Sequence, residues 1–262
     1  MLAFPQIDPV LIRIGPLAVR WYGLMYLLAF GVGYLVIRGL GRRRNVAMAD
    51  TTASDLLFHA MLGVILGGRL GYVLFYNPGY YLRHPLRIFA VWEGGMSFHG
   101  GLLGVVAAVL IFSYRKRLPV LLVADIMAAA AAPGLFFGRI GNFINGELWG
   151  RVTDLPWGMV FPGAGSAPRH PSQLYEALLE GLVLTVVLLL LHRRKVAHGV
   201  PFFTFFLLYG VFRFAVEFVR EPDAHLGYLW AGATMGQLLS LPMIGLGIVG
   251  LMLVLKKKKA LR

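Results

Sequence analysis

The chain contains seven apolar runs, each long enough to cross a bilayer as a helix. They lie near residues 18–38, 56–76, 95–113, 120–138, 174–192, 201–219 and 233–255. A membrane-spanning helix needs about 20 mainly apolar residues. The whole chain is 58% hydrophobic and 14% charged, whereas soluble domains carry about 25% charged residues. We therefore predict an all-α integral membrane protein with seven transmembrane helices in a single domain over residues 1–262.

Basic residues cluster in every second connection between these runs. Cytoplasmic loops of membrane proteins carry an excess of lysine and arginine, so these connections are predicted to be cytoplasmic. The amino terminus is then outside and the carboxyl terminus inside. The net charge of +13 therefore indicates topology, and we predict no nucleic-acid partner. The clusters are Arg38 with Arg42–Arg44, Arg115–Arg117, Arg193–Lys195, and Lys256–Lys259 with Arg262.

The connections on the other side have a different composition. They are rich in aromatic residues, glycine and proline, and tyrosine and tryptophan are typical of the membrane interface. The segment 139–173 is longer than a simple connection needs, and long loops without regular structure are often functional. We expect the outer loops, and 139–173 in particular, to form the working surface of the protein.

Several kinds of chemistry are excluded or unsupported. Cysteine is absent, which excludes disulfides, thiolate metal sites and a cysteine nucleophile. Any thiol in the reaction must belong to a substrate. The seven histidines show no paired metal-binding spacing, and neither a G-x-S-x-G elbow nor a phosphate-binding loop is present. We predict no metal site and no cofactor.

Some charged side chains fall inside or at the ends of apolar runs. A charge at the bilayer centre costs about 2.5–3.5 kcal/mol on insertion scales, so such residues face the bundle interior or a water-filled cavity and mark functional sites. We therefore expect functional roles among these residues, which include Arg69, His99, Arg139, Glu176, Glu180, Arg213, Glu217 and Arg220.

The sixth run carries a polar stripe on an otherwise apolar helix. At 100° per residue, its members fall within about 80° of arc; they are Tyr209, Arg213, Glu217 and Arg220. One interpretation is an internal ion pair between Arg213 and Glu217 that only holds helices together. The excess of arginine over carboxylate around the stripe favours an anionic ligand instead.

The stretch "GRIGNFINGELWG", residues 138–150, also indicates an anion site. The guanidinium of Arg139 offers a rigid fork of donors that matches phosphate. Its glycines would let backbone N–H groups approach a ligand, and Asn142 and Asn145 can supply amide donors. The alternative is a glycine-rich turn whose polar groups satisfy its own backbone, and the two interpretations are compatible.

His99 lies in the third run between pairs of glycines. A lone histidine in a membrane span is more often a packing residue than a catalyst. Its unperturbed pKa of about 6.5 nevertheless makes it the natural base among these residues.

The ordered set of motifs resembles the prolipoprotein diacylglyceryl transferases of bacterial inner membranes. The resemblance covers nearly the whole chain, and no motif position departs from the family pattern. Besides "GRIGNFINGELWG", the motifs are "VRWYGLMY", "GGRLGY", "GGMSFHGG", "RHPSQLYEALLEG" and "LYGVFRFAVEFVREPD".

This resemblance implies a reaction and its substrates. The family transfers a diacylglyceryl group from phosphatidylglycerol to the lipobox cysteine thiol of a prolipoprotein signal peptide, forms a thioether and releases glycerol phosphate. It implies catalytic roles for Arg139, Arg213, His99, Tyr22 and Tyr209. Residues predicted to bind phosphatidylglycerol are Arg139, Asn142, Asn145, Glu147, Gly150, Glu217, Arg220 and Arg69.

Two questions stay open at this point. The general base is His99, Tyr22, Glu147 or no protein group at all. A multipass carrier for an anionic solute is the alternative function, although carriers often show pseudo-symmetric halves with interrupted helices, and none is visible in this sequence.

The placement of the arginines leads to a geometric expectation. The set from Arg139 to Glu147 is expected to line a cavity in the outer half of the bilayer, opposite the stripe around Arg213. Two facing arginines repel each other unless an anion lies between them, so a lipid phosphate is expected there. The cavity is expected to open sideways, because a two-chain lipid cannot enter through water.

Overall fold

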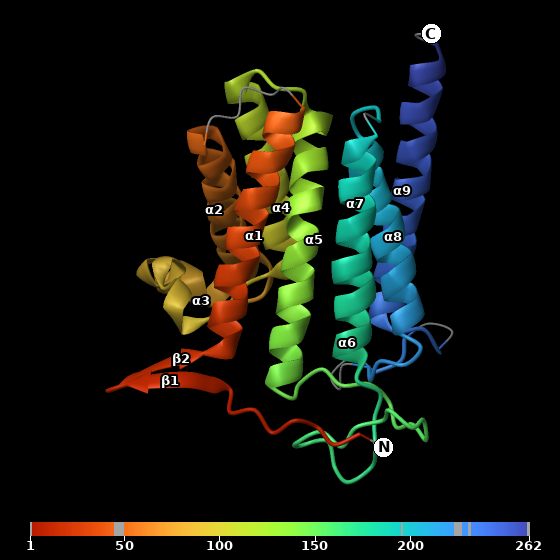
Figure 1. The fold of residues 1–262 in the computed structure, drawn as a ribbon. Helices are drawn as coiled ribbons and strands as arrows, with labels where there is room; N and C mark the ends of the chain where they lie inside the picture. Colours follow the sequence, from red (N-terminus) through yellow and green to blue (C-terminus); the bar gives the residue numbers. More distant parts are fainter. Residues whose placement is uncertain (1, 45–49, 195, 223–226, 230–231, 261–262) are drawn as a thin grey trace. The chain divides into compact units, whose positions relative to one another are not determined.

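The computed structural model describes residues 2–44, 50–194, 196–222, 227–229 and 232–260, and most of them are helical (Figure 1). Within this described part, six helices are long and apolar enough to cross a membrane, and α8 is shorter, at 17 residues. The main helices are α1 Trp21–Arg43, α2 Asp50–Phe75, α4 Phe98–Lys116, α5 Val120–Ile144, α7 Leu184–Arg193, α8 Val200–Val216 and α9 Met235–Ala260.

Shorter elements complete the described chain. They are the strands β1 Val10–Ile14 and β2 Leu17–Arg20, the helices α3 Pro78–Arg83 and α6 Ser172–Glu176, the 3₁₀ turns η1 Pro85–Phe89 and η2 Val91–Glu93, and the π-helical segment η3 Ala177–Val183. The hairpin of β1 and β2, in which Ile14 pairs with Leu17, was not part of the all-α expectation. Its turn includes Gly15 at a φ of +58°, a conformation that favours glycine in a two-residue hairpin turn.

The helices match the predicted runs in order, but some ends differ. α5 continues to Ile144 and does not end at residue 138. Arg139 and Asn142 therefore project from a helix, whereas the sequence placed residues 139–173 in a loop. α2 begins at Asp50 and not near residue 56. Apolar composition finds the membrane-embedded part of a helix and misses polar turns that continue it.

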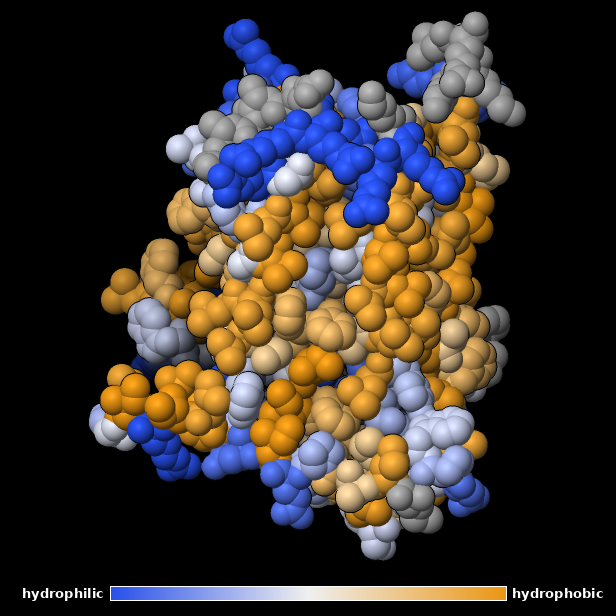
Figure 2. Space-filling model, in the orientation of Figure 1, coloured by the Kyte–Doolittle hydropathy of each residue, from blue (hydrophilic) through white to orange (hydrophobic). Residues whose placement is uncertain are grey.

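The chain divides into two compact units, which we call the first unit (Met1–Ile37 with Asp125–Arg262) and the second unit (Arg38–Ala124). In the first unit, α6 and the loop before it lie at one end, and the carboxyl end of α9 lies at the other (Figure 1). Figure 2 shows hydrophobic side chains over the middle of the helices on the face drawn, with hydrophilic side chains toward the helix ends.

Small residues allow close helix packing in the first unit. A Cβ added to Gly247 of α9 would lie 2.6 Å from the backbone nitrogen of Leu207 in α8, and one added to Gly181 would lie 2.6 Å from Cα of Phe136 in α5. Lipid offers little hydrophobic drive for helix association, so membrane helices depend on such close van der Waals packing. The first contact joins α9 to α8, and the second joins η3 to α5.

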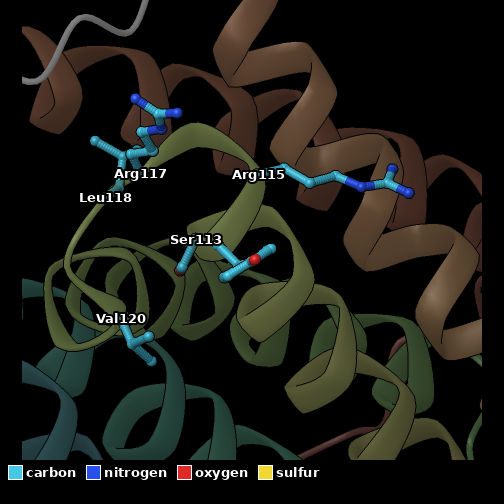
Figure 3. Close-up of a pocket in the computed structure, with 6 residues that line it drawn as sticks. Ser113, Arg115, Arg117, Leu118 and Val120 are labelled. Carbon is cyan, nitrogen blue, oxygen red and sulfur yellow. The ribbon is translucent and has the colours of Figure 1, made fainter.

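In the second unit, α2 packs against α4 through glycines four residues apart. A Cβ on Gly67 would lie 2.8 Å from Cα of Gly104, and one on Gly71 would lie 2.8 Å from Cα of Gly100. The glycines of "GGRLGY" and "GGMSFHGG" thus include packing residues. A pocket of about 580 Å³ adjoins the carboxyl end of α4. Figure 3 shows its lining side chains, none of which is a predicted site residue.

Candidate active site

Three arginines and three glutamates meet at one end of the first unit. Arg139 comes from α5, Glu176 from α6 and Glu180 from η3. Arg213 lies in the last turn of α8, Glu217 caps that helix, and Arg220 follows it. We call these six residues the ion cluster. The structure thus brings together Arg139 and the charged members of the predicted stripe.

Glu176 is the centre of the ion cluster. Its Oε2 atom lies 2.6 Å from Nε of Arg139 and 3.1 Å from Nη1 of Arg213. Its Oε1 atom lies 3.6 Å from Nε of Arg220. One carboxylate therefore holds arginines from two segments far apart in sequence.

Glu217 and Glu180 complete the pairing. Oε1 of Glu217 lies 2.5 Å from Nη2 of Arg213 and 3.5 Å from Nη1 of Arg220. Glu180 is more loosely paired, with its oxygens 3.7 Å from Nη2 of Arg139 and 3.9 Å from Nη1 of Arg213. The proposed ion pair between Arg213 and Glu217 is therefore present, as part of a larger network.

The expected excess of arginine is wrong, because the cluster contains as many glutamates as arginines. Glu176 and Glu180 were recognised in the sequence as charges at the start of the fifth run, but they were not assigned to the site. Buried charges in a low-dielectric interior need partners, and the spacing of four residues in "YEALLEG" places both carboxylates on one helical face. That spacing was the available signal. The arginines do not need an anion between them to be compensated.

The two kinds of side chain differ in exposure. The three glutamates are at most 1% exposed, whereas the side chains of Arg139 and Arg213 are 19% and 14% exposed. The carboxylates are therefore the more deeply buried members of the cluster, and the side chains of Arg139 and Arg213 keep some exposure. The ion pairs restrict the direction of each arginine fork.

The π-helical segment η3 places Glu180 in the cluster. Gly181 lies against the backbone of Phe136, three residues before Arg139 on α5, so α5 and η3 approach closely at this level. π-bulges are rare and often occur at functional sites. Here the bulge lies between Glu176 and the regular helix α7, where the carboxylates face Arg139.

The loop before α6 is hydrogen-bonded to the end of α8. Nε of Arg151 donates to the carbonyl of Arg220 at 3.0 Å, and its Nη2 donates to that of Glu217 at 3.1 Å. Gly150 pairs with Arg220 in a β-bridge, and a Cβ on Gly150 would lie 2.5 Å from the Val219 carbonyl. Close packing therefore accounts for glycine at position 150 without the predicted contact between Gly150 and lipid. Sequence reasoning missed Arg151.

A second polar group surrounds Glu147. The side-chain amides of Asn142 and Asn145 donate to its Oε1 at 2.9 and 3.2 Å, and Gln173 donates to its backbone carbonyl at 2.6 Å. These two asparagines, predicted as lipid donors, thus bind a carboxylate. Each amide nitrogen carries a second N–H that can serve a ligand.

Two tyrosines of the prediction also lie in the first unit. The ring of Tyr22 packs on Gly141 of α5, where a Cβ would lie 2.8 Å from the ring, and its hydroxyl lies 3.4 Å from that of Tyr26. Tyr209 stacks on Phe205, with ring centroids 5.8 Å apart, and it has electrostatic contact with Glu180 and Arg213. Tyr209 therefore adjoins the ion cluster, as the stripe predicts.

His170 lies just before α6, outside the membrane-spanning helices. Its Nδ1 is 3.3 Å from the Tyr175 hydroxyl, which accepts a hydrogen bond from the Trp157 indole at 2.7 Å. Burial lowers the pKa of His170 below its ordinary value, which favours the neutral ring. Its location supports a structural role at the entry to α6.

Arg69 and His99 belong to the second unit. Arg69 is buried, and its guanidinium donates to the carbonyls of Ile88 at 2.8 Å, Arg87 at 2.5 Å, Gly95 at 3.2 Å and Gly94. These bonds fix the segment between α3 and α4, so a lipid would have to compete with them. His99 is exposed in the first turn of α4. Their roles in lipid binding and proton transfer stay predictions.

The chain matches known proteins over nearly its whole length. The family model described as prolipoprotein diacylglyceryl transferase matches residues 9–253. A phosphatidylglycerol–prolipoprotein diacylglyceryl transferase of Geobacter sulfurreducens is 57% identical over 257 residues, covering 98% of this chain and 99% of the relative. Proteins of the same name from Bordetella parapertussis and Photobacterium profundum are 56% and 54% identical, covering 93% and 99% of this chain and 94% and 96% of their own.

These matches extend across both units and include every segment that contributes to the ion cluster. Identity above one half over almost the full length of both chains leaves no large part of the fold without a counterpart in these relatives. The chain belongs to the prolipoprotein diacylglyceryl transferase family.

Proposed function

We propose that this chain transfers the diacylglyceryl group of phosphatidylglycerol to the lipobox cysteine thiol of a prolipoprotein. The observation that carries the proposal is the pairing of Arg139 and Arg213 on one oxygen of Glu176, in a chain of this family. In the reaction, the thiol sulfur attacks the lipid glycerol carbon, a C–S bond forms and the C–O bond to phosphate breaks. Glycerol phosphate leaves with the bonding electrons, and the thiol proton passes to a base or to solvent.

The arginines suit the departing phosphate. Negative charge builds on the phosphate as the C–O bond breaks, so guanidinium groups directed at it stabilise the transition state more than the ground state. Arg139 and Arg213 fill this role in the proposal, with Tyr209 beside them. Glu217 and Arg220 hold Arg213 and extend the anion site.

The remaining predicted residues complete the substrate site in this proposal. Asn142, Asn145 and Glu147 serve the lipid headgroup, and Gly150 keeps the loop close to Arg220. Tyr22 lies next to this group, and Arg69, in the second unit, is a further residue for phosphatidylglycerol.

A general base helps the thiol but is not indispensable. A thiol with a pKa of about 8.5 loses its proton to a histidine of about 6.5 at a cost of about 2.7 kcal/mol, which is small beside a typical reaction barrier. His99 is the base in this proposal, and Tyr22 and Glu147 are the other candidates. Arginines near the thiol would lower its pKa without any base.

The membrane arrangement is part of the proposal. α8, together with the turn that ends at Arg220, is the seventh span, since 17 residues are at the lower limit of spanning length. The amino terminus and the loop between α5 and α6 lie outside the bacterial inner membrane, and the carboxyl terminus lies in the cytoplasm. The arginine-rich side opens laterally to lipid. In this arrangement residues 1–262 act as one transmembrane domain.

Mass spectrometry of a lipobox peptide tests the proposed function. The purified protein is incubated with the peptide and phosphatidylglycerol, and the expected result is a mass gain of one diacylglyceryl group on the cysteine. A peptide with alanine in place of that cysteine is the matched control and should remain unmodified. An unmodified cysteine peptide, with protein that is folded and lipid that is present, would overturn the proposal.

A further inference from the structure

The carboxylate of Glu217 is held from two sides. Its Oε1 faces Arg213 at 2.5 Å and Arg220 at 3.5 Å. Its Oε2 accepts a hydrogen bond of 2.5 Å from the hydroxyl of Thr234. Thr234 immediately precedes α9, and both it and Glu217 are almost fully buried. Glu217 therefore links the ion cluster to the start of α9, a helix that carries no member of the cluster.

The direction of the Thr234 hydroxyl is fixed by the cap of α9. The backbone N–H of Gln237 donates to Oγ1 of Thr234 at 3.2 Å, and the side chain of Gln237 accepts from the backbone N–H of Thr234 at 3.0 Å. This reciprocal pair is a capping box. A hydroxyl has a single proton to donate, and the capping bond uses a lone pair. The proton is thus available only for Glu217.

Gly236 makes room for the same carboxylate. A Cβ added to Gly236 would overlap the carboxyl group of Glu217 and lie 2.9 Å from its Cγ. The amino-terminal end of a helix also favours a nearby negative charge. The hydrogen bond from Thr234 holds the Glu217 carboxylate at the start of α9. The capping box fixes Thr234, and the absence of a side chain at Gly236 leaves room for the carboxylate.

We propose that Thr234 and Gly236 are positioning residues for the transfer reaction. They hold Glu217, and Glu217 orients the guanidinium of Arg213 toward the lipid phosphate. This inference rests on the proposed function. It gives the amino-terminal end of α9 a role in the reaction. Thr234 and Gly236 lie outside all the motifs on which the family resemblance was based.

The test compares variants of Thr234 in diacylglyceryl transfer to a lipobox peptide. Thr234→Val keeps the shape of the side chain and removes the proton that Glu217 accepts. Because hydrogen bonds to charged groups contribute more than neutral ones, we expect kcat/KM for phosphatidylglycerol to fall about tenfold or more, mainly through kcat. Thr234→Ser restores the hydroxyl and should remain within about threefold of the wild type.

Two further variants separate positioning from general support of α9. Ser240 is also buried on α9, and its hydroxyl donates to the Gly236 carbonyl at 2.7 Å without contacting Glu217; Ser240→Ala should leave kcat within about twofold. Gly236→Ala should repeat the kcat loss of Thr234→Val. Gly245→Ala, at an open position on the same helix, should not.

The outcomes distinguish this inference from the proposed function. Wild-type transfer together with unchanged kcat in Thr234→Val overturns the inference alone. Equal losses in Thr234→Val and Thr234→Ser, or losses that follow the melting temperature across all variants including Ser240→Ala, also overturn it. A wild-type protein that transfers nothing overturns the proposed function and this inference with it.

Discussion

Arg139 and Arg213 share one oxygen of Glu176, so the position of each guanidinium depends on the other. At the scale of single residues this sharing explains why both arginines can be held in a largely apolar helix bundle. A carboxylate that binds two forks restricts their rotation.

The first prediction concerns the shape of Arg139. Arg139→Lys keeps the positive charge and loses the planar fork that matches phosphate, so we expect the transfer rate to fall at least about tenfold with little loss of stability. Arg139→Ala should cost about 10²-fold or more in rate. It also takes one cationic partner from the buried Glu176 and Glu180, and removing one partner of a buried ion pair typically costs about 3–5 kcal/mol of stability.

Transfer by folded, detergent-purified protein measures these effects, with Arg115→Lys in the last turn of α4 as the control. Normal transfer by Arg139→Lys would show that charge alone suffices. Near-normal transfer by Arg139→Ala would remove Arg139 from the reaction.

The second prediction concerns Glu180, whose ion pairs of 3.7 and 3.9 Å are the longest in the cluster. Glu180→Gln removes one negative charge while the closer contacts of Glu176 remain. At an effective dielectric constant of about 20, a carboxylate about 6 Å from a phosphate repels it by roughly 3 kcal/mol. We therefore expect the KM for phosphatidylglycerol to fall about tenfold or more.

Glu176→Gln is the contrasting variant, because it weakens the contact that orients both arginines and should reduce kcat. The Michaelis parameters of both variants at low ionic strength provide the comparison. An unchanged or higher KM in Glu180→Gln would mean that this carboxylate does not oppose the lipid phosphate.

Helical periodicity was enough to predict the stripe of Arg213, Glu217 and Arg220, because these residues belong to one continuous segment. It could not assign Glu176 and Glu180 to Arg139, since partners on different helices depend on how those helices pack. The same limit applies to Arg151, which lies in an irregular loop. Side-chain neighbours were therefore predictable within one helical segment and not between segments.

At the scale of secondary-structure elements, the fifth predicted run is a composite of α6, η3 and α7. Its apolar composition is uniform enough to predict one helix, and no residue type marks the π-helical segment. The segment follows from packing: Gly181 lies directly on Phe136 of α5. Hydropathy predicts that such a span exists but not where its hydrogen-bond pattern changes.

The third prediction uses that contact. A Cβ at position 181 would lie 2.6 Å from both Cα and Cβ of Phe136, closer than the backbones can tolerate without moving apart. Gly181→Ala should separate Glu176 and Glu180 from Arg139, reduce transfer about tenfold or more, and cost about 1–3 kcal/mol of stability through overpacking.

Gly245→Ala is the control for this change, because nothing lies within 4 Å of its added Cβ and alanine favours a helix interior. Transfer rates and thermal midpoints of the two variants, measured in the same detergent, give the comparison. Equal midpoints and equal rates would show that the approach of η3 to α5 is not tight.

At the scale of the whole molecule, the ion cluster and a basic cluster lie at opposite ends of the helices in the first unit, as the predicted topology requires. The ion cluster and the loop that contains Arg151 lie at one end of it, and at the other end Arg193 closes α7 and Arg194 follows. The segment from Ala177 to Arg193 has 17 residues, about 25 Å of helix. The order of the apolar helices was predictable from sequence, because length and composition determine where they lie.

The final prediction concerns the side of the membrane on which the ion cluster lies. The chain has no cysteine, so a single introduced cysteine is the only thiol to label. Ser166, in the loop before α6, and Arg194, after α7, are both exposed. The basic connections are predicted to be cytoplasmic. A membrane-impermeant maleimide should therefore label Ser166→Cys in intact cells, and label Arg194→Cys only after permeabilisation.

The labelling result decides which leaflet supplies the lipid. The loop of Ser166 is joined to the cluster through Arg169, which contacts the Gly150 carbonyl at 3.2 Å and Glu221 at 2.9 Å. Labelling of Ser166→Cys from outside thus places Arg139 and Arg213 near the outer leaflet, where they meet phosphate headgroups and the translocated part of a prolipoprotein. The reverse pattern would place the arginines at the cytoplasmic leaflet and contradict the proposed topology.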